Sequence, residues 1–180
     1  MRITTGKYRN RKIQMPKGIR PTQDKVRKAI FDILGDISGL TFLELFAGSG
    51  AVGLEALSRG ASELVMVESN RDSILAIKKN IQLLKATDCN LYHLEAEKTV
   101  KLLFLNKKRF DIIFIDPPYL EGMAKKILQT LEGYDILAAH GLIVIQHSKA
   151  ELLPKDALKF DLIKEARYGD TRLSIFRKKE

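Results

Sequence analysis

The sequence is poor in the residues that build disulfides and metal sites. Its 180 residues include one cysteine, Cys89, and three histidines that lack the spacing of metal ligands. A single cysteine excludes an internal disulfide and any zinc site that needs several cysteines. We therefore expect no bound metal.

Long apolar stretches are also missing. The longest runs, such as Phe110 to Ile115 and Leu142 to Ile145, have the length of β-strands, whereas a membrane-spanning helix needs about 20 apolar residues. The N-terminus also lacks the apolar segment of a secretory signal. We therefore expect a cytoplasmic protein, with a monomer as the default state.

Acidic residues are nearly absent from the N-terminal segment. Residues 1–28 contain ten lysines and arginines but one acidic residue, Asp24, so this segment carries the whole formal net charge of +9. Such a segment binds a phosphate backbone well because binding releases counterions, although a solvated basic tail has the same composition. Tyr8 and the glycines Gly6 and Gly18 favour a folded hairpin over a disordered tail. The candidate phosphate contacts are Arg9, Arg11, Arg20 and Arg27.

Strand-like and helix-like segments alternate along the rest of the chain. A helix with Thr22 as its N-cap is followed by expected strands over 41–46, 63–68, 90–94, 110–115 and 141–146, with helices between them. This alternation predicts right-handed βαβ units in an α/β fold with a mostly parallel sheet. Strand-like segments 160–166 and 172–177 add an antiparallel hairpin and give seven strands. We expect one domain, with a basic arm over 1–20 and a Rossmann-like core over 21–180.

Three glycines follow the first expected strand. Gly48, Gly50 and Gly53 allow a tight turn and a close approach of the backbone to a ligand. Glu68, at the end of the second strand, can accept hydrogen bonds from two ribose hydroxyls, or else it is a capping or solvated residue before Asn70. Both NAD and S-adenosylmethionine fit this pattern, which therefore indicates a nucleoside cofactor without identifying it.

The segment Asp116-Pro117-Pro118-Tyr119 directly follows the fourth expected strand, where ligands bind in open α/β sheets. The nitrogen of an aromatic amino group is a poor nucleophile because its lone pair is delocalised into the ring. Two acceptors, the Asp116 carboxylate and the Pro117 carbonyl, can hold its N–H groups and turn the lone pair toward a methyl donor. The prolines stiffen the loop, and Tyr119 offers a flat face for stacking a base.

These residues resemble a known family. Asp116-Pro117-Pro118-Tyr119 after Phe46-Ala47-Gly48-Ser49-Gly50 is similar to class I S-adenosylmethionine-dependent methyltransferases that act on exocyclic amino groups. Further segments along nearly the whole chain resemble one family in particular, the bacterial small-subunit (16S) ribosomal RNA guanine-N2 methyltransferases. Near the N-terminus these are residues 2–6, residues 9–12, and Arg20-Pro21-Thr22 followed by Asp24, Val26 and Arg27. Further along they are residues 54–60 and Tyr168-Gly169-Asp170-Thr171.

The resemblance implies a single-domain enzyme that uses S-adenosylmethionine to make N2-methylguanosine in 16S ribosomal RNA, within an assembled or nearly assembled small subunit. Catalysis then falls to Asp116, Pro117 and Tyr119, and Tyr119 also contacts the substrate. The cofactor would be bound by Glu44, Phe46, Gly48, Gly50, Glu68, Glu95, Ala96 and Asp116. Glu95 stands where the family usually has Asp, with Glu97 as a neighbouring candidate, and Gln146 stands where we expect Glu.

Three other functions fit parts of the sequence. The same loop chemistry serves a methyltransferase acting on N6 of DNA adenine or on a protein glutamine amide, although a DNA enzyme usually carries a target-recognition domain. A nucleotide-binding dehydrogenase leaves residues 116–119 and the basic arm unexplained. A noncatalytic RNA-binding module explains the arm alone. For Gln146 and His147, a structural contact at the strand end is the favoured interpretation.

Overall fold

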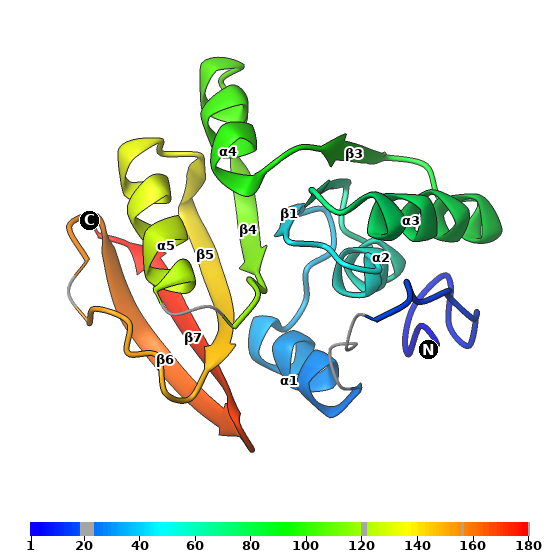
Figure 1. The fold of residues 1–180 in the computed structure, drawn as a ribbon, viewed down its shortest axis with the longest axis horizontal. Coiled ribbons are helices and arrows are strands. Elements are labelled where there is room, and N and C mark those ends of the chain that lie inside the picture. The colour runs from blue at the N-terminus through cyan, green and yellow to red at the C-terminus, as the bar shows by residue number, and fades with distance from the viewer. Residues whose placement is uncertain (19–23, 120–121, 156, 180) are drawn as a thin grey trace.

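The computed structural model describes residues 1–18, 24–119, 122–155 and 157–179 (Figure 1). Its helices are α1 (Asp24–Leu34), α2 (Ala51–Ser58), α3 (Arg71–Leu84), α4 (Ala96–Leu105) and α5 (Met123–Gly133). Its strands are β1 (Thr41–Leu45), β2 (Glu63–Glu68), β3 (Cys89–His93), β4 (Phe110–Ile115), β5 (Leu137–Ser148), β6 (Phe160–Tyr168) and β7 (Thr171–Lys178).

The strands form one seven-stranded sheet in the order β3-β2-β1-β4-β5-β7-β6. The first five strands are parallel, and β7 runs antiparallel to both β5 and β6. The predicted α/β fold with its C-terminal hairpin is therefore confirmed. The hairpin is tighter than expected, because Gly169 adopts a positive φ of 63° and only two residues join the strands.

Strand β5 begins four residues before the predicted start at position 141. Its register against β4 shifts between the pairs Phe110–Leu137 and Ile112–Leu142. Gly141 lies in this irregularity, and a Cβ atom there would approach the Leu137 side chain to 2.8 Å and the Asp111 carbonyl to 3.0 Å. The bulge thus depends on a glycine, which the alternating pattern of the sequence did not reveal.

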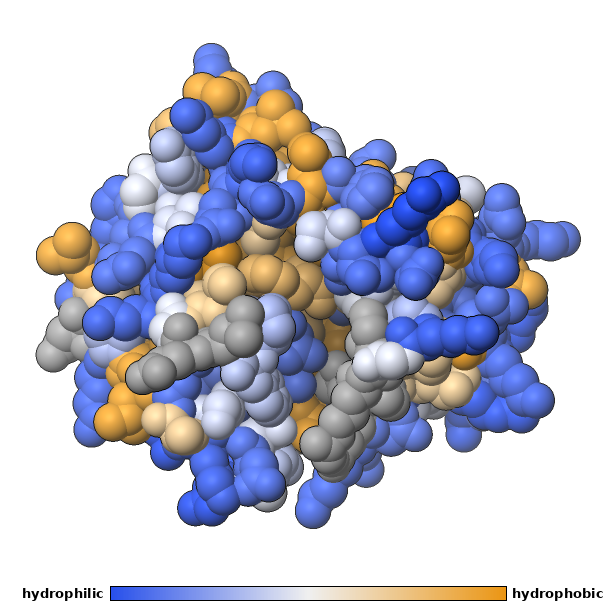
Figure 2. Space-filling view, viewed as in Figure 1, coloured by the Kyte–Doolittle hydropathy of each residue, from blue (hydrophilic) through white to orange (hydrophobic). Residues whose placement is uncertain are grey.

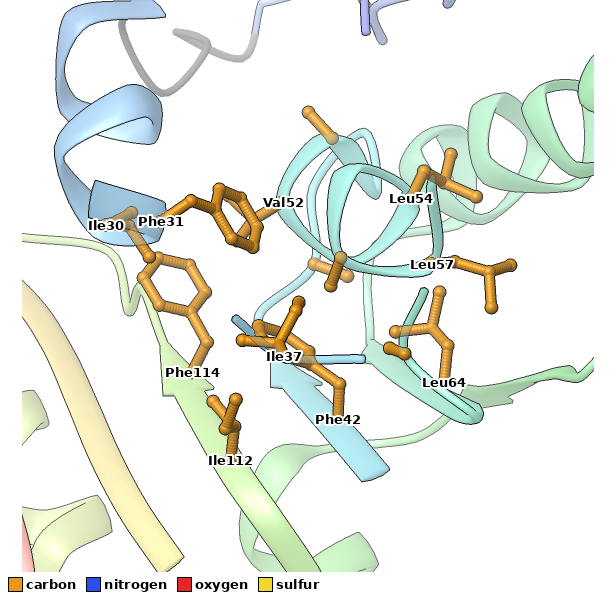
Figure 3. Close-up of a cluster of buried hydrophobic side chains, with 14 of the residues drawn as sticks. Ile30, Phe31, Ile37, Phe42, Val52, Leu54, Leu57, Leu64, Ile112 and Phe114 are labelled. Carbon is orange, nitrogen blue, oxygen red and sulfur yellow. The ribbon is translucent and has the colours of Figure 1, made fainter. Parts of the chain in front are cut away.

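Helices cover both faces of the sheet, so the central strands are apolar on both sides. One core packs α1, α2 and α3 against the sheet, and Figure 3 shows Phe31 of α1 and Val52 of α2 over Phe42 and Phe114. The second core packs α4 and α5 against the opposite face. Within the described residues, no helix is long and apolar enough to cross a membrane.

The N-terminal arm is folded onto the helical layer rather than free in solvent. Its ends pair through a bridge between Arg2 and Lys12. Three apolar side chains of the arm, Ile3, Tyr8 and Ile13, are buried in the first core. Gly6 lies so close to α2 that a Cβ atom would stand 1.8 Å from the Ser58 carbonyl oxygen. The apolar side chains of the arm are consequently part of the hydrophobic core.

Candidate active site

A cavity of about 1070 Å³ opens at the carboxyl ends of the parallel strands, as expected for an open α/β sheet. Figure 2 shows the face on which mostly hydrophilic side chains surround apolar ones near the centre. The structure brings most of the predicted site residues together in the wall of this cavity. These are Glu44, Phe46, Gly48, Glu68, Glu95, Ala96, Asp116, Pro117 and Tyr119.

Residues 46–49 of the loop from Phe46 to Gly50 line the cavity, and the loop turns through left-handed backbone conformations. Phe46 has a φ of 60°, which is uncommon for a residue with a bulky side chain, and Gly48 and Gly50 have φ values of 56° and 72°. Gly50 lies behind the lining, at the N-terminus of α2, where a Cβ atom would stand 3.0 Å from the Met66 sulfur. Its role here is to make the turn and allow close packing.

Glu68, at the end of β2, holds this loop in place. One carboxylate oxygen accepts the Gly48 N–H at 2.7 Å, and the other accepts the N–H groups of Ser69 and Asn70 at 2.8 Å each. The two interpretations of Glu68 are therefore compatible, because it organises the backbone and also lines the cavity. The oxygen that accepts the Gly48 N–H has a second lone pair with which to accept a hydroxyl, whereas the other oxygen already accepts two N–H groups.

Glu44 is a carboxyl group at the bottom of the cavity, 2% exposed. It accepts the Gly53 N–H at 3.0 Å, and a Cβ atom at Gly53 would stand 2.6 Å from the same oxygen. Burial raises the pKa of Glu44 to about 8, opposed by the hydrogen bond from Gly53 and reinforced by the negative charges of Asp116 and Glu68. A cation placed here would favour the ionised form.

The segment Asp116 to Tyr119 lies between β1 and the turn that joins β6 and β7. The Asp116 N–H donates to the Leu45 carbonyl at 3.4 Å, which holds the loop beside the glycine loop. Asp116 is half-buried and Pro117 is buried. Tyr119 is 51% exposed at the mouth of the cavity, and its hydroxyl is 3.0 Å from the Thr171 Oγ1. The tyrosine ring is thus tethered while its face stays accessible.

The adenine-side candidates lie at the start of α4. Ala96 is buried, while the Glu95 carboxylate is mostly exposed and pairs with Lys98 at 2.9 Å. That partner lowers the pKa of Glu95 through a hydrogen bond and its charge. Glu97 also lines the cavity and pairs with Lys126. The structure therefore retains both Glu95 and Glu97 as candidates.

Gln146 and His147 differ although they are neighbours. His147 is bonded within the sheet, with Nε2 2.8 Å from the Ser174 hydroxyl and Nδ1 3.0 Å from the Ser148 carbonyl. Burial is the main cause that lowers its pKa. Gln146 instead lines the cavity, and no described residue donates a hydrogen bond to its buried Oε1. A purely structural contact at the strand end therefore explains His147, but it leaves the buried Oε1 of Gln146 unexplained.

The structure corrects one of the predicted phosphate contacts. The Arg27 side chain is 1% exposed, so it is not available to a phosphate on the surface. It lies on the buried face of α1 and pairs with Asp24 at 3.0 Å, while its NH2 group donates to the Arg2 carbonyl at 2.7 Å. Arg9 and Arg11 are exposed, although Arg11 also donates to the Leu83 carbonyl. Arg20 and the predicted N-cap Thr22 lie outside the described residues.

The sequence did not predict two groups of residues that line the cavity. One group consists of Met15, Lys25 and Val26, and the other is the turn from Tyr168 to Thr171. Asn80 of α3 joins the arm to the glycine loop, because its amide donates to the carbonyls of Gln14 and Ser49 at 3.0 Å each. The turn was visible in the sequence only through the family resemblance, and no local signal marked Met15 or Asn80.

Comparisons with known proteins identify a matching family and solved structures with the same fold. Residues 1–177 match the family model described as conserved hypothetical protein 95. Ribosomal RNA small subunit methyltransferase D of Escherichia coli K12 is 33% identical over 99% of this chain and 90% of its own length. A solved hypothetical protein of Thermus thermophilus is 32% identical and covers 97% of this chain and 98% of its own, with a TM-score of 0.86. A more distant structure, complexed with SAH, shares the fold at 20% identity over 89% of this chain and 50% of its own, with a TM-score of 0.70.

Proposed function

The chain belongs to the conserved hypothetical protein 95 family, and on this basis we propose that it transfers a methyl group from S-adenosylmethionine to the exocyclic N2 of a guanine in 16S ribosomal RNA. Methyl transfer to small-subunit ribosomal RNA is the activity named for its full-length relative from Escherichia coli. The finer choice of guanine N2, and of an assembled or nearly assembled subunit as substrate, is our proposal.

The residues around the glycine loop fit S-adenosylmethionine. A cavity with a glycine cradle, the ribose-side carboxylate Glu68 and the buried acid Glu44 suits a nucleoside joined to a cationic amino acid. We assign Ala96 with Glu95 or Glu97 to the adenine side. When bound, the cofactor supplies an electrophilic methyl group on a sulfonium.

The observation that carries the proposal is the position of Asp116 and Pro117 in the same cavity as Glu44 and Glu68. The Asp116 carboxylate and the Pro117 carbonyl accept the two N–H groups of an amino nitrogen, which localises its lone pair for attack. The loop is fixed by its prolines and by the hydrogen bond to Leu45, so these acceptors are preorganised. In-line transfer then depends mainly on proximity and alignment.

The mouth of the cavity is suited to a base taken out of its stack. Tyr119 presents an accessible ring, tethered to the β6–β7 turn through Thr171, and aromatic faces stack unpaired bases. Lys25 also lines the cavity. Exposed Arg9 and Arg11 extend the positive charge along the arm, where RNA phosphates would bind.

The experiment that tests this function is methyl transfer from labelled S-adenosylmethionine to small ribosomal subunits that lack their native modifications, followed by nucleoside analysis. Labelled N2-methylguanosine is the expected product. Label in free 16S RNA but not in subunits would contradict the assembled substrate. No label in either, with the cofactor still bound, would favour an amino group of DNA adenine or protein glutamine instead.

A further inference from the structure

The feature that the proposed chemistry leaves unused is the side chain of Gln146. It is 6% exposed, it lines the cavity, and its Oε1 has no hydrogen-bond partner among the residues that the structure describes. A buried amide oxygen without a donor destabilises a fold, so most are paired. Neighbouring His147 and Ser174 show that the same strands do pair their buried polar groups. The unpaired oxygen therefore calls for a donor from a ligand.

The register of the sheet places Gln146 beside the amino-binding loop. Ile115 at the end of β4 pairs with Ile145 of β5, so Asp116, directly after β4, and Gln146 of β5 are the residues that follow this pair. Paired residues of adjacent strands point to the same face of a sheet, and both residues line the cavity. The side chains of Asp116 and Gln146 thus border one ligand space.

The strand order separates Gln146 from the cofactor side. Glu68 and Glu44 lie on β2 and β1, on one side of β4, whereas Gln146 lies on β5, on the other side. Asp116 follows β4, between these two sides, where the proposed reaction brings the methyl group of the cofactor to the amino nitrogen of the substrate. A donor that reaches Gln146 consequently belongs to the substrate rather than to the nucleoside cofactor.

From this arrangement, and resting on the proposed function, we infer that Gln146 accepts the ring N1–H of the target guanine and so selects guanine. On the edge of guanine, N1–H adjoins the N2 amino group, so three donated hydrogens lie side by side. Asp116 and Pro117 take the two amino hydrogens, and Gln146 takes the third. In adenine, the ring nitrogen beside the amino group is an acceptor, which would face the Gln146 oxygen without a hydrogen between them.

An amide suits this position because the cavity already holds several carboxylates. Glu44 has a pKa raised by its burial and by the charges of Asp116 and Glu68. A further acid beside Asp116 would add to this repulsion. Glutamine supplies the acceptor without a charge, which gives a physical reason for Gln146 where the family resemblance led us to expect Glu.

The test compares Gln146→Met, which keeps the length and loses the acceptor, with Gln146→Glu, which keeps an acceptor. Gln82→Met, at an exposed position of α3, is the matched control. Three quantities are measured: single-turnover methylation of unmodified small subunits, the Kd for SAH, and the thermal unfolding midpoint. For Gln146→Met we expect a rate about 10- to 100-fold lower, because a buried hydrogen bond to the base is lost. We expect Gln146→Glu to be faster than Gln146→Met, and Gln82→Met to match the original protein.

The other two measurements separate this role from a structural one. Gln146→Met should bind SAH within about twofold of the original protein, and its unfolding midpoint should be unchanged or higher, because an unpaired buried acceptor has been removed. An unchanged rate, a lower midpoint with weaker SAH binding, or a Gln146→Glu variant as slow as Gln146→Met would overturn the inference. A failure of the proposed function looks different, since then the original protein itself yields no N2-methylguanosine.

Discussion

Arg27 of α1 and Glu55 of α2 form a buried ion pair, with Arg27 Nε 3.7 Å from Glu55 Oε2 and both side chains at most 1% exposed. The same carboxylate accepts the Thr4 N–H at 2.8 Å and the Thr4 hydroxyl at 2.6 Å, and it pairs with Arg59 at 3.0 Å. One acidic side chain therefore fastens the arm and α1 to α2. Arg27 and the segments 2–6 and 54–60, which belong to the parts of the sequence that resemble one family, meet at or beside this carboxylate.

Replacing Glu55 with Ala should strongly destabilise the fold, because it removes the buried charge partner of the Arg27 guanidinium and the acceptor for the Thr4 N–H and hydroxyl, while Asp24, the other partner of Arg27, is exposed. We expect the free energy of unfolding to fall by about 3–5 kcal/mol, measured by urea denaturation. Glu63→Ala is the control, since the Glu63–Lys108 pair is partly exposed, and it should cost less than about 1 kcal/mol. Equal losses in the two variants would contradict a special role for Glu55.

Replacing Asp116 with Ala should separate chemistry from cofactor binding. We expect methyl transfer to slow by at least about 100-fold, as when one preorganised transition-state contact is removed, while SAH binding is largely kept. The measurements are single-turnover methylation and calorimetric titration with SAH. Asp116→Asn keeps one carbonyl acceptor and should be less impaired than Asp116→Ala. Retained turnover in the Ala variant would refute the assigned role of the carboxylate.

Glu44 should make the stability of the cofactor-free protein depend on pH. Its folded-state pKa of about 8 lies above the ordinary value of 4.5, so the native state prefers the protonated form. The contribution to stability is fully present below the unfolded pKa and is lost as pH rises through 8. Compared with Glu44→Gln, the unmodified protein should lose stability between about pH 4.5 and 8. Parallel pH profiles of the two proteins, measured by urea denaturation, would contradict this.

The same carboxyl group should release a proton when the cofactor binds. A cationic ligand beside Glu44 favours the carboxylate and lowers its pKa, so binding near neutral pH should expel a proton that Glu44→Gln cannot supply. Calorimetric titration with S-adenosylmethionine in buffers of different ionisation enthalpy measures the number of protons released. An identical buffer dependence for both proteins would show that Glu44 does not face the charged part of the cofactor.

The contribution of the arm to RNA binding is best tested by removing charges one at a time. Truncation would also remove Ile3, Tyr8 and Ile13 from the core, so lost binding would not report on phosphate contacts alone. Arg9→Gln should weaken binding to 16S RNA and reduce the slope of log K against log salt concentration by about 0.7–0.9. Lys164→Gln, at an exposed position of β6, should leave the slope unchanged. Equal slopes in all three proteins would exclude Arg9 as a phosphate contact.

Sequence alone predicted the features that depend on local pattern. The strand ends before Phe46, after Glu68 and before Asp116 were placed within a residue or two, because a buried parallel strand leaves an apolar run that stops at a polar or glycine-rich loop. Most of the side chains predicted from the rule that ligands bind at the carboxyl ends line one cavity. For these residues, local sequence and topology together were sufficient.

Prediction was wrong or silent where a side chain depends on distant partners. Arg27 was predicted to contact phosphate because it belongs to the basic segment 1–28, yet the helical period puts it on the face of Ile30 and Phe31. Glu55, which makes that burial possible, follows 28 residues later, so no local pattern links the two. The Gln146 oxygen, which has no partner among the residues that the structure describes, likewise depends on how the strands assemble and has no signature in the sequence.

The pairing of β1 with β4 joins residues about seventy positions apart, such as Phe42 with Ile112. Contacts this distant in the chain form slowly, because a long loop must close before they contribute any stability. Phe46 and Asp116 lie immediately beyond this pairing, so the cofactor loop and the amino-binding loop meet only after it is complete. During refolding, SAH affinity should therefore appear in the final kinetic phase, and the ligand becomes a reporter for molecules that have finished folding.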